Sequence, residues 1–137
     1  MTTTLPQLKF ESKPENIAVV ERLIDQISTE YGIIPEHYGN VLIAMTEAVN
    51  NAITHGNKLD LKKSVGVSCA VDGKSLVFRI TDEGPGFDYD NLPDPTAPEN
   101  IEKPHGRGVF LMRHLADECD FEDDGRIVVL TFTEVLA

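Results

Sequence analysis

The sequence predicts an α+β sandwich, in which helices cover one face of a mostly antiparallel sheet. Three observations predict it: two amphipathic helical stretches follow a short first strand, two alternating strands joined by a tight turn come next, and a further helix precedes a last pair of strands. Strands joined by hairpins pair antiparallel and leave one face for helices. The 137 residues, 41% of them hydrophobic, suit a single domain over 1–137.

The first elements are expected to be a short strand over 5–11 and a helix. Ser12 and Glu15 have the spacing of a capping box, which predicts that the helix begins there; Gly32 predicts where it ends. The inner side of this helix carries apolar residues at helical spacing, namely Ile17, Val20, Leu23 or Ile24, and Ile27.

The second helix carries a polar stripe. It is expected to begin at Pro35 and to run to about Gly56. Glu47, Asn51 and His55 stand four residues apart, so they share one face beside an apolar arc. A carboxylate and an amide held beside a packed face can polarise a nucleophile and bind a hard cation such as Mg²⁺.

Alternation then replaces the helical period. Residues 65–71 and 76–80 are predicted strands around the hairpin turn Asp72-Gly73. Asp82 follows the second strand and leads into a glycine turn, Gly84-Pro85-Gly86. A helix over 107–116 and two closing strands, at Phe121 and over 127–132 around a turn at 123–125, are expected to complete the sheet.

Two stretches of the second half have the composition of a nucleotide site. Residues 88–104 hold four prolines and little apolar periodicity, which is typical of a lid or binding loop. The turns at Gly84-Pro85-Gly86 and Gly106-Arg107-Gly108 allow backbone N–H groups to approach a polyanion. Each feature alone is common on protein surfaces, but their order along the chain indicates a Mg-ATP site.

Composition excludes other classes of protein. A net charge of −11 argues against duplex nucleic acid, whose phosphates require basic patches, and is compatible with a protein partner. No apolar run approaches the roughly 20 residues of a membrane span, and the start lacks a signal peptide's pattern. Cys69 and Cys119 have no metal-site spacing, which favours reduced thiols and a cytoplasmic location without membrane contact.

Three ordered motifs resemble those of the GHKL (Bergerat-fold) ATPases, and within them the small anti-sigma-factor serine-protein kinases of partner-switching systems. Glu47-x-x-x-Asn51-Ala-x-x-His55-Gly56 is similar to their N box. Asp82-x-Gly84-x-Gly86 is similar to their first glycine box, and Gly106-Arg-Gly108-Val-Phe-Leu-Met-Arg113 to their second. The resemblance spans nearly the whole chain and implies the two-layer sandwich of the histidine-kinase-like ATPase fold.

The resemblance also implies roles for these residues. Glu47 would deprotonate or orient the attacking hydroxyl, Asn51 would bind Mg²⁺, and Asp82 would accept a hydrogen bond from the adenine amino group. Residues 88–104 would form the ATP lid. The remaining nucleotide contacts implied are His55, Gly84, Gly86, Gly106, Arg107, Gly108 and Val109. Arg107 would meet phosphate, because a guanidinium fork matches phosphate oxygens.

Two positions depart from the family's pattern. Gly125 is followed by Arg126 where relatives often carry Thr, so a usual polar contact near the nucleotide is lost or replaced by a longer cation. His105 stands where a small residue often precedes the glycine turn, so the packing of the lid is expected to differ.

Three functions follow from the resemblance. The leading one is an ATP-dependent serine/threonine kinase that phosphorylates a STAS-like anti-sigma antagonist protein and sequesters a sigma factor, with two copies of the chain pairing. The alternative is an ATP-dependent binding module that sequesters a partner and transfers little or no phosphate. A detached ATP domain of a histidine-kinase-like system is disfavoured, because no phosphoacceptor helix is found. Glu47 favours the kinase, since sequestration needs no base.

Overall fold

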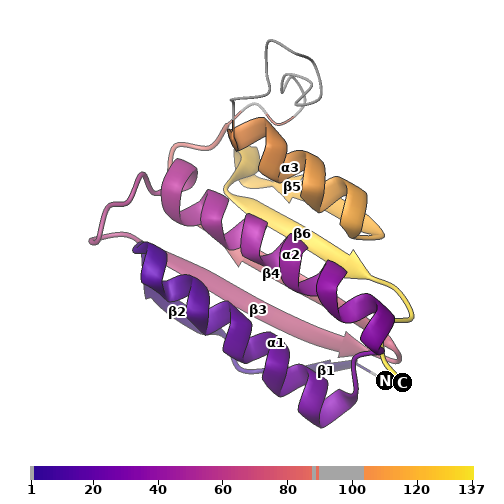
Figure 1. The fold of residues 1–137 in the computed structure, drawn as a ribbon. Coiled ribbons are helices and arrows are strands. Elements are labelled where there is room, and N and C mark those ends of the chain that lie inside the picture. The colour runs from indigo at the N-terminus through magenta and orange to yellow at the C-terminus, as the bar shows by residue number, and fades with distance from the viewer. Residues whose placement is uncertain (1, 88, 90–103) are drawn as a thin grey trace.

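The computed structural model describes residues 2–87, 89 and 104–137, except for the side chains of 104–107. Within these residues, six antiparallel strands form one sheet in the order β1-β3-β4-β6-β5, and β2 also pairs with β3. Figure 1 shows α1, α2 and α3 side by side on one face of that sheet, with α2 in the middle. The predicted α+β sandwich is therefore confirmed.

The strands lie close to their predicted positions, with one exception at the N-terminus. Their bounds are β1 Thr2–Thr4, β2 Leu8–Glu11, β3 Ser64–Asp72, β4 Ser75–Thr81, β5 Glu118–Glu122 and β6 Ile127–Phe132. Only Leu8–Glu11 of the expected strand over 5–11 forms a strand, and β1 comes before that range; the two pair with opposite halves of β3. Pro6 separates them, because proline has no N–H to donate to the ladder.

The boundary between α1 and α2 lies where local signals predict, whereas α3 begins at Pro104, three residues before its expected start, and the end of α2 changes helix type. The helical segments are η1 Pro14–Asn16, α1 Ile17–Tyr31, α2 Pro35–Asn51, the π-turn Ala52–Gly56, α3 Pro104–Leu115 and the short 3-10 segment η4 Asp123–Gly125. Gly32 ends α1 in the left-handed conformation at φ 72°, and Pro35 occupies the first turn of α2. The predicted helix does reach Gly56, but its last turn is wider than an α-turn.

The predicted capping box at Ser12 is wrong. Lys13 precedes η1 and no side chain caps it. Ser12 is fully buried; its Oγ donates to the Lys63 carbonyl (2.6 Å) and accepts from Asn57 Nδ2 (2.8 Å). A buried hydroxyl without partners costs more free energy than an uncapped helix end open to water, so the tertiary partners of Ser12 prevail.

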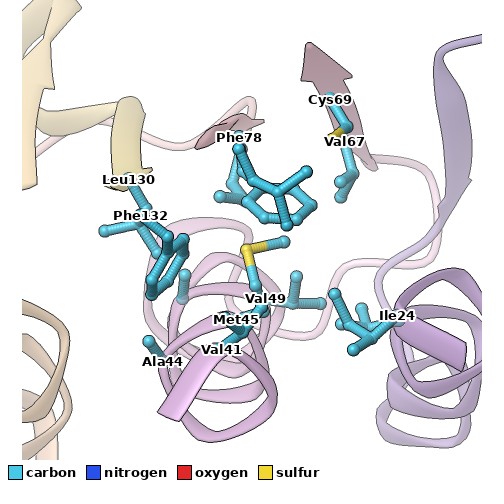
Figure 2. Packing of buried hydrophobic residues seen from close by; sticks show 14 of the residues in the cluster. Ile24, Val41, Ala44, Met45, Val49, Val67, Cys69, Phe78, Leu130 and Phe132 are labelled. Atoms are coloured by element: carbon cyan, nitrogen blue, oxygen red, sulfur yellow. The ribbon is translucent and has the colours of Figure 1, made fainter. Parts of the chain in front are cut away.

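The hydrophobic core lies between the sheet and the helices, and α2 supplies its centre. Figure 2 shows Met45 reaching from α2 toward Phe78 of β4, with Phe132 on one side and Ile24 of α1 on the other. All four side chains are at most 1% exposed. Val41 lies one turn before Met45 on the same face, as the helical period predicts.

None of the helices within the described ranges has the length and hydropathy needed to cross a membrane.

Candidate functional site

A pocket opens where the C-terminal end of α2 meets the C-terminal end of β4 and the N-terminal end of β6. It is lined by Ala48, Asn51, Ala52, His55, Gly56, Ile80, Asp82, Gly86, Phe87, Met112, Phe121, Gly125, Arg126 and Val128. Of the site residues predicted from the sequence, the pocket lining includes Asn51, His55, Asp82 and Gly86. The helix stripe and the first glycine turn, which are about 30 residues apart in the sequence, thus share one cavity.

Asp82 is held by backbone groups immediately after β4. Its N–H donates to the Arg126 carbonyl (2.9 Å), and its Oδ1 accepts from the Gly84 N–H (2.8 Å). Burial raises the pKa of the Asp82 carboxyl above its ordinary value, and the Gly84 N–H and the Arg126 guanidinium only partly offset this effect. A half-buried carboxylate facing a pocket is suited to accept a hydrogen bond from a ligand.

The glycines around Asp82 are required by close packing. A Cβ on Gly56 would lie 2.5 Å from the Asp82 carboxyl carbon, and one on Gly84 would lie 1.9 Å from the Gly56 carbonyl oxygen. Gly86 has φ 82°, and its Cβ would lie 2.3 Å from the Asp124 carbonyl oxygen. The first glycine turn is therefore wedged between the π-turn and the segment before β6.

Glu47 and Asn51 meet at the surface of α3. A Cβ on Gly108 would lie 3.0 Å from both amide atoms of Asn51 and 3.2 Å from Glu47 Oε2. The absence of a side chain at Gly108 therefore lets α3 approach the carboxylate and the amide closely.

One atom of the Asn51 side-chain amide, its nitrogen, lacks a hydrogen-bond partner within the part of the chain that the structure describes. This nitrogen, Nδ2, is buried. Buried polar atoms without partners are rare in native proteins and often mark a ligand site. The described residues contain no group of three or more His, Cys, Asp or Glu suited to a metal ion. The Asn51 side-chain oxygen is a donor of the kind that Mg²⁺ prefers, and Mg²⁺ commonly completes its oxygen ligands with water and phosphate.

The second glycine turn lies inside α3 rather than before it. The helix begins at Pro104, so Gly106 and Arg107 are in its first turn. Counted from the N-cap residue, the first four N–H groups of a helix lack an intrahelical acceptor, which leaves that of Gly106 available to an anion but not those of Arg107 and Gly108. The side chain of Val109 is 1% exposed and belongs to the core.

Some predictions fall outside the residues that the structure describes. The expected lid, 88–104, lies outside them except for Tyr89 and Pro104, and so do the side chains of His105 and Arg107. His55 is described: it lies in the π-turn and lines the pocket, and its burial lowers the pKa of the imidazole.

Sequence reasoning missed an aromatic wall of the pocket. Phe87 meets Phe121 edge to face at 5.4 Å between ring centroids, and Tyr89 stacks on Phe121 at 4.9 Å. The guanidinium of Arg113 lies 5.6 Å from the Phe121 centroid and donates to the Tyr89 carbonyl (3.0 Å). The alternation of Phe87 and Tyr89 after the glycine turn was the available signal.

Sequence reasoning also missed a buried polar network behind the pocket. Asn57, 1% exposed, donates through Nδ2 to Ser12 Oγ (2.8 Å) and to the Ser64 carbonyl (3.0 Å). Its Oδ1 accepts from the Glu83 N–H (2.7 Å). Asn57 thus ties the end of the π-turn to β3 and to the residue that follows Asp82.

Known proteins resemble this chain over most of its length. Residues 10–132 match the family described as the histidine kinase-like ATPase domain. The proteins named serine-protein kinase RsbW from Bacillus cereus (strain AH820) and Bacillus anthracis are each 25% identical over 132 residues, which cover 91% of this chain and 82% of theirs.

A solved structure has the same fold. It contains the RsbU and RsbW domains of Rv1364c from Mycobacterium tuberculosis, and it matches 96% of this chain with a TM-score of 0.64 at 18% identity. The match covers 33% of that longer chain.

Proposed function

The chain belongs to the family of histidine kinase-like ATPase domains, among its RsbW-like members, and from this premise we propose that it binds Mg-ATP in the pocket beside Asp82. In this proposal the Asp82 carboxylate accepts a hydrogen bond from the adenine amino group. Gly84 and Gly86 let the base approach the turn, and His55 contacts the nucleotide from the π-turn. The first turn of α3, with Gly106 and Arg107, faces the phosphates. Gly108 and Val109 are the next two residues of the helix.

The reaction proposed is transfer of the γ-phosphoryl group of ATP to a serine or threonine of a protein substrate. The hydroxyl oxygen forms a bond to the γ-phosphorus, the bond from that phosphorus to the β-γ bridging oxygen breaks, and ADP leaves. Glu47 takes the hydroxyl proton. Asn51 would bind Mg²⁺, which supplies charge neutralisation on the phosphates when bound.

The observation that carries the proposal is the junction of Glu47, Asn51 and Gly108. It brings a carboxylate to an amide whose nitrogen has no partner among the described residues. The name of the relatives, serine-protein kinase RsbW, supports a serine as acceptor. The proposed partners are an antagonist protein of the STAS-like class as phosphoacceptor and a sigma factor as the sequestered protein, with the chain acting in the cytoplasm as a homodimer.

The test is a phosphorylation assay with purified protein, a candidate antagonist and labelled ATP, in which phosphoserine is identified by mass spectrometry. Glu47→Gln should keep nucleotide affinity and lose transfer, because the base acts on the acceptor. Asn51→Ala should weaken both, because a Mg²⁺ ligand serves the ground state and the transition state. Glu36→Gln, an exposed acid in the first turn of α2, is the matched control and should do neither.

A second candidate is a module that sequesters its partner with ATP bound and transfers little phosphate. The same assay separates the two, since the module would form the complex without phosphoserine. Equal complex formation and an equal amount of phosphate transferred in Glu47→Gln and in the wild type would favour the module. Calorimetry that finds no nucleotide binding to the folded wild-type protein would exclude both.

A further inference from the structure

Arg126 holds the first glycine turn from two sides. Its side chain donates through Nε to the Gly84 carbonyl (2.7 Å), through Nη2 to the Pro85 carbonyl (3.1 Å) and through Nη1 to the Asp123 carbonyl (3.1 Å). Its own backbone carbonyl accepts the N–H of Asp82 (2.9 Å). One residue therefore joins the turn after β4 to the turn before β6.

The two turns also interlock by their backbones. The Phe87 N–H donates to the Asp124 carbonyl (2.9 Å). Gly86 and Gly125 have no room for a Cβ, since Gly125 would place one 2.7 Å from the Phe87 ring. Beside these backbone contacts, the carbonyls of Gly84 and Pro85 accept hydrogen bonds from the Arg126 guanidinium.

Arginine suits this position for a geometric reason. Nε and Nη2 point the same way along one edge of a planar group, so they can donate to two successive carbonyls at once. Lysine offers a point charge at the end of a flexible stem and cannot reproduce that fork. The carboxylates of Asp123 and Asp124, at 3.5 Å and 3.6 Å from Nη1, balance the charge on the outer side.

We propose that Arg126 is a positioning residue of the nucleotide site, which fixes the segment from Asp82 to Gly86 in its ligand-binding shape before a nucleotide arrives. Arg126 lines the same pocket, and its side chain stays 31% exposed at the rim. A site held in its bound conformation loses less entropy on binding and therefore binds more tightly. The effect on ATP affinity rests on the proposed function. The hydrogen bonds from Arg126 to the Gly84 and Pro85 carbonyls, called the clamp below, do not.

The clamp should act on nucleotide affinity and not on the chemical step. Glu47 and Asn51 lie on α2, and no hydrogen bond of Arg126 among the described residues reaches either of them. Removing the fork should therefore raise the KM for ATP and leave kcat at saturating ATP nearly unchanged.

The experiment compares Arg126→Met, Arg126→Lys and the matched control Arg79→Met. Arg79 is an exposed arginine of β4 whose described ion pair is with Glu122, so its loss changes the charge equally without touching the turn. Hydrogen exchange without nucleotide reads the turn over 84–87, calorimetry reads ATP affinity, and steady-state kinetics separate KM from kcat. Thermal melting checks that each variant is folded.

Arg126→Met is expected to lose exchange protection over 84–87 and to bind ATP about tenfold more weakly, with kcat changed less than about twofold. Arg126→Lys should fall between Arg126→Met and the wild type, and it keeps the test decisive if Arg126→Met does not fold. Arg79→Met should match the wild type in every measurement.

Two results would overturn the inference. One is unchanged exchange and unchanged ATP affinity in folded Arg126→Met or Arg126→Lys. The other is a lowered kcat with an unchanged KM, which would assign Arg126 to phosphoryl transfer. A wild-type protein that binds no ATP would refute the proposed function, and exchange over 84–87 would still decide whether the clamp exists.

Discussion

At the scale of single residues, the binding role proposed for Asp82 conflicts with the stability of the fold. Burial raises the pKa of its carboxyl, so the folded state disfavours the charge that a ligand amino group would need. The Gly84 N–H and the nearby Arg126 favour the charged form and recover part of this cost. Such a conflict is typical of a binding site, where local stability is given up for a directed polar group.

Asp82→Asn should abolish most ATP affinity without destabilising the protein. Asparagine keeps an oxygen for the Gly84 N–H, but its amide adds a donor facing the adenine amino group. Because the folded pKa of Asp82 is raised, its contribution to stability is full below the unfolded pKa and is lost as pH rises through the folded pKa.

Asp82→Asn should therefore not lose stability as pH rises through the folded pKa of Asp82. At pH 7 it should be at least as stable as the wild type. Calorimetry and urea denaturation at pH 4 and pH 7 measure the two effects. A less stable variant at pH 7 would contradict the interpretation.

At the scale of elements, the junction of α2 and α3 depends on a glycine inside a helix. Gly108 costs α3 helical stability relative to alanine, by about 0.5–1 kcal/mol. In return it allows α3 to lie against the side chains of Glu47 and Asn51. A glycine at this position is thus explained by the close approach of α3 to Glu47 and Asn51 and not by helix propensity.

Gly108→Ala should leave the melting temperature nearly unchanged and lower phosphoryl transfer by about tenfold or more, because displaced catalytic groups lose rate steeply. The added methyl would lie 3.0 Å from the Asn51 amide and 3.2 Å from Glu47 Oε2, so these side chains must shift. Gly39→Ala is the control, since a Cβ on Gly39 meets nothing within 4 Å. It should stabilise α2 and leave activity intact; equal activity in both variants would refute the role of the junction.

The end of α2 shows how an element is shaped by a distant contact. Asn57 bonds Ser12, Ser64 and Glu83, which come from the chain before η1, from β3 and from the turn after β4. The Asn57 N–H also bonds the Ala52 carbonyl (2.8 Å), which closes the π-turn. The buried side chain and the wide last turn therefore belong together.

Asn57→Ala should lower the free energy of unfolding by about 2–4 kcal/mol, because it leaves the Glu83 N–H and the Ser64 carbonyl without their partner. ATP affinity should fall as well, since Glu83 separates Asp82 from Gly84. Asn50→Ala is the control: Asn50 accepts one long bond from Thr54 (3.4 Å), and its loss should cost less than about 0.5 kcal/mol. Urea denaturation decides, and equal midpoints would contradict the prediction.

At the scale of the whole molecule, α2 is both the centre of the core and the carrier of the site. Met45 packs toward the sheet, and Glu47 and Asn51 on the same helix meet α3. Close packing on one side of a helix fixes the position of its backbone and therefore the points from which the side chains on its other sides extend. The position of the proposed catalytic groups is therefore set by the core.

Met45→Ala should lower the free energy of unfolding by about 2–5 kcal/mol, because a fully buried side chain leaves a cavity. Ile43→Ala, at a neighbouring position of α2 that is 46% exposed, should cost much less. Guanidinium denaturation followed by circular dichroism compares them. Similar losses would mean that Ile43 is covered in solution.

Much of the fold follows from local patterns in the sequence. Alternation predicts β3 and β4, Asp72-Gly73 predicts their hairpin, and Gly32 and Pro35 predict the boundary between α1 and α2. These signals hold because each depends on the backbone of a few neighbouring residues. The spacing of Glu47 and Asn51 is of the same kind, since one helical turn aligns them.

Local patterns in the sequence thus account for most of the helices and strands, for the family and for the candidate polar groups. Tertiary structure alone decided that Ser12 bonds Lys63 and Asn57 instead of capping a helix, and that Arg126 bonds a turn about 40 residues earlier in the chain. Such partners depend on strand register and on how α2 packs, which set distances between residues far apart in sequence. No periodicity encodes those distances, because they exist only once the core has closed.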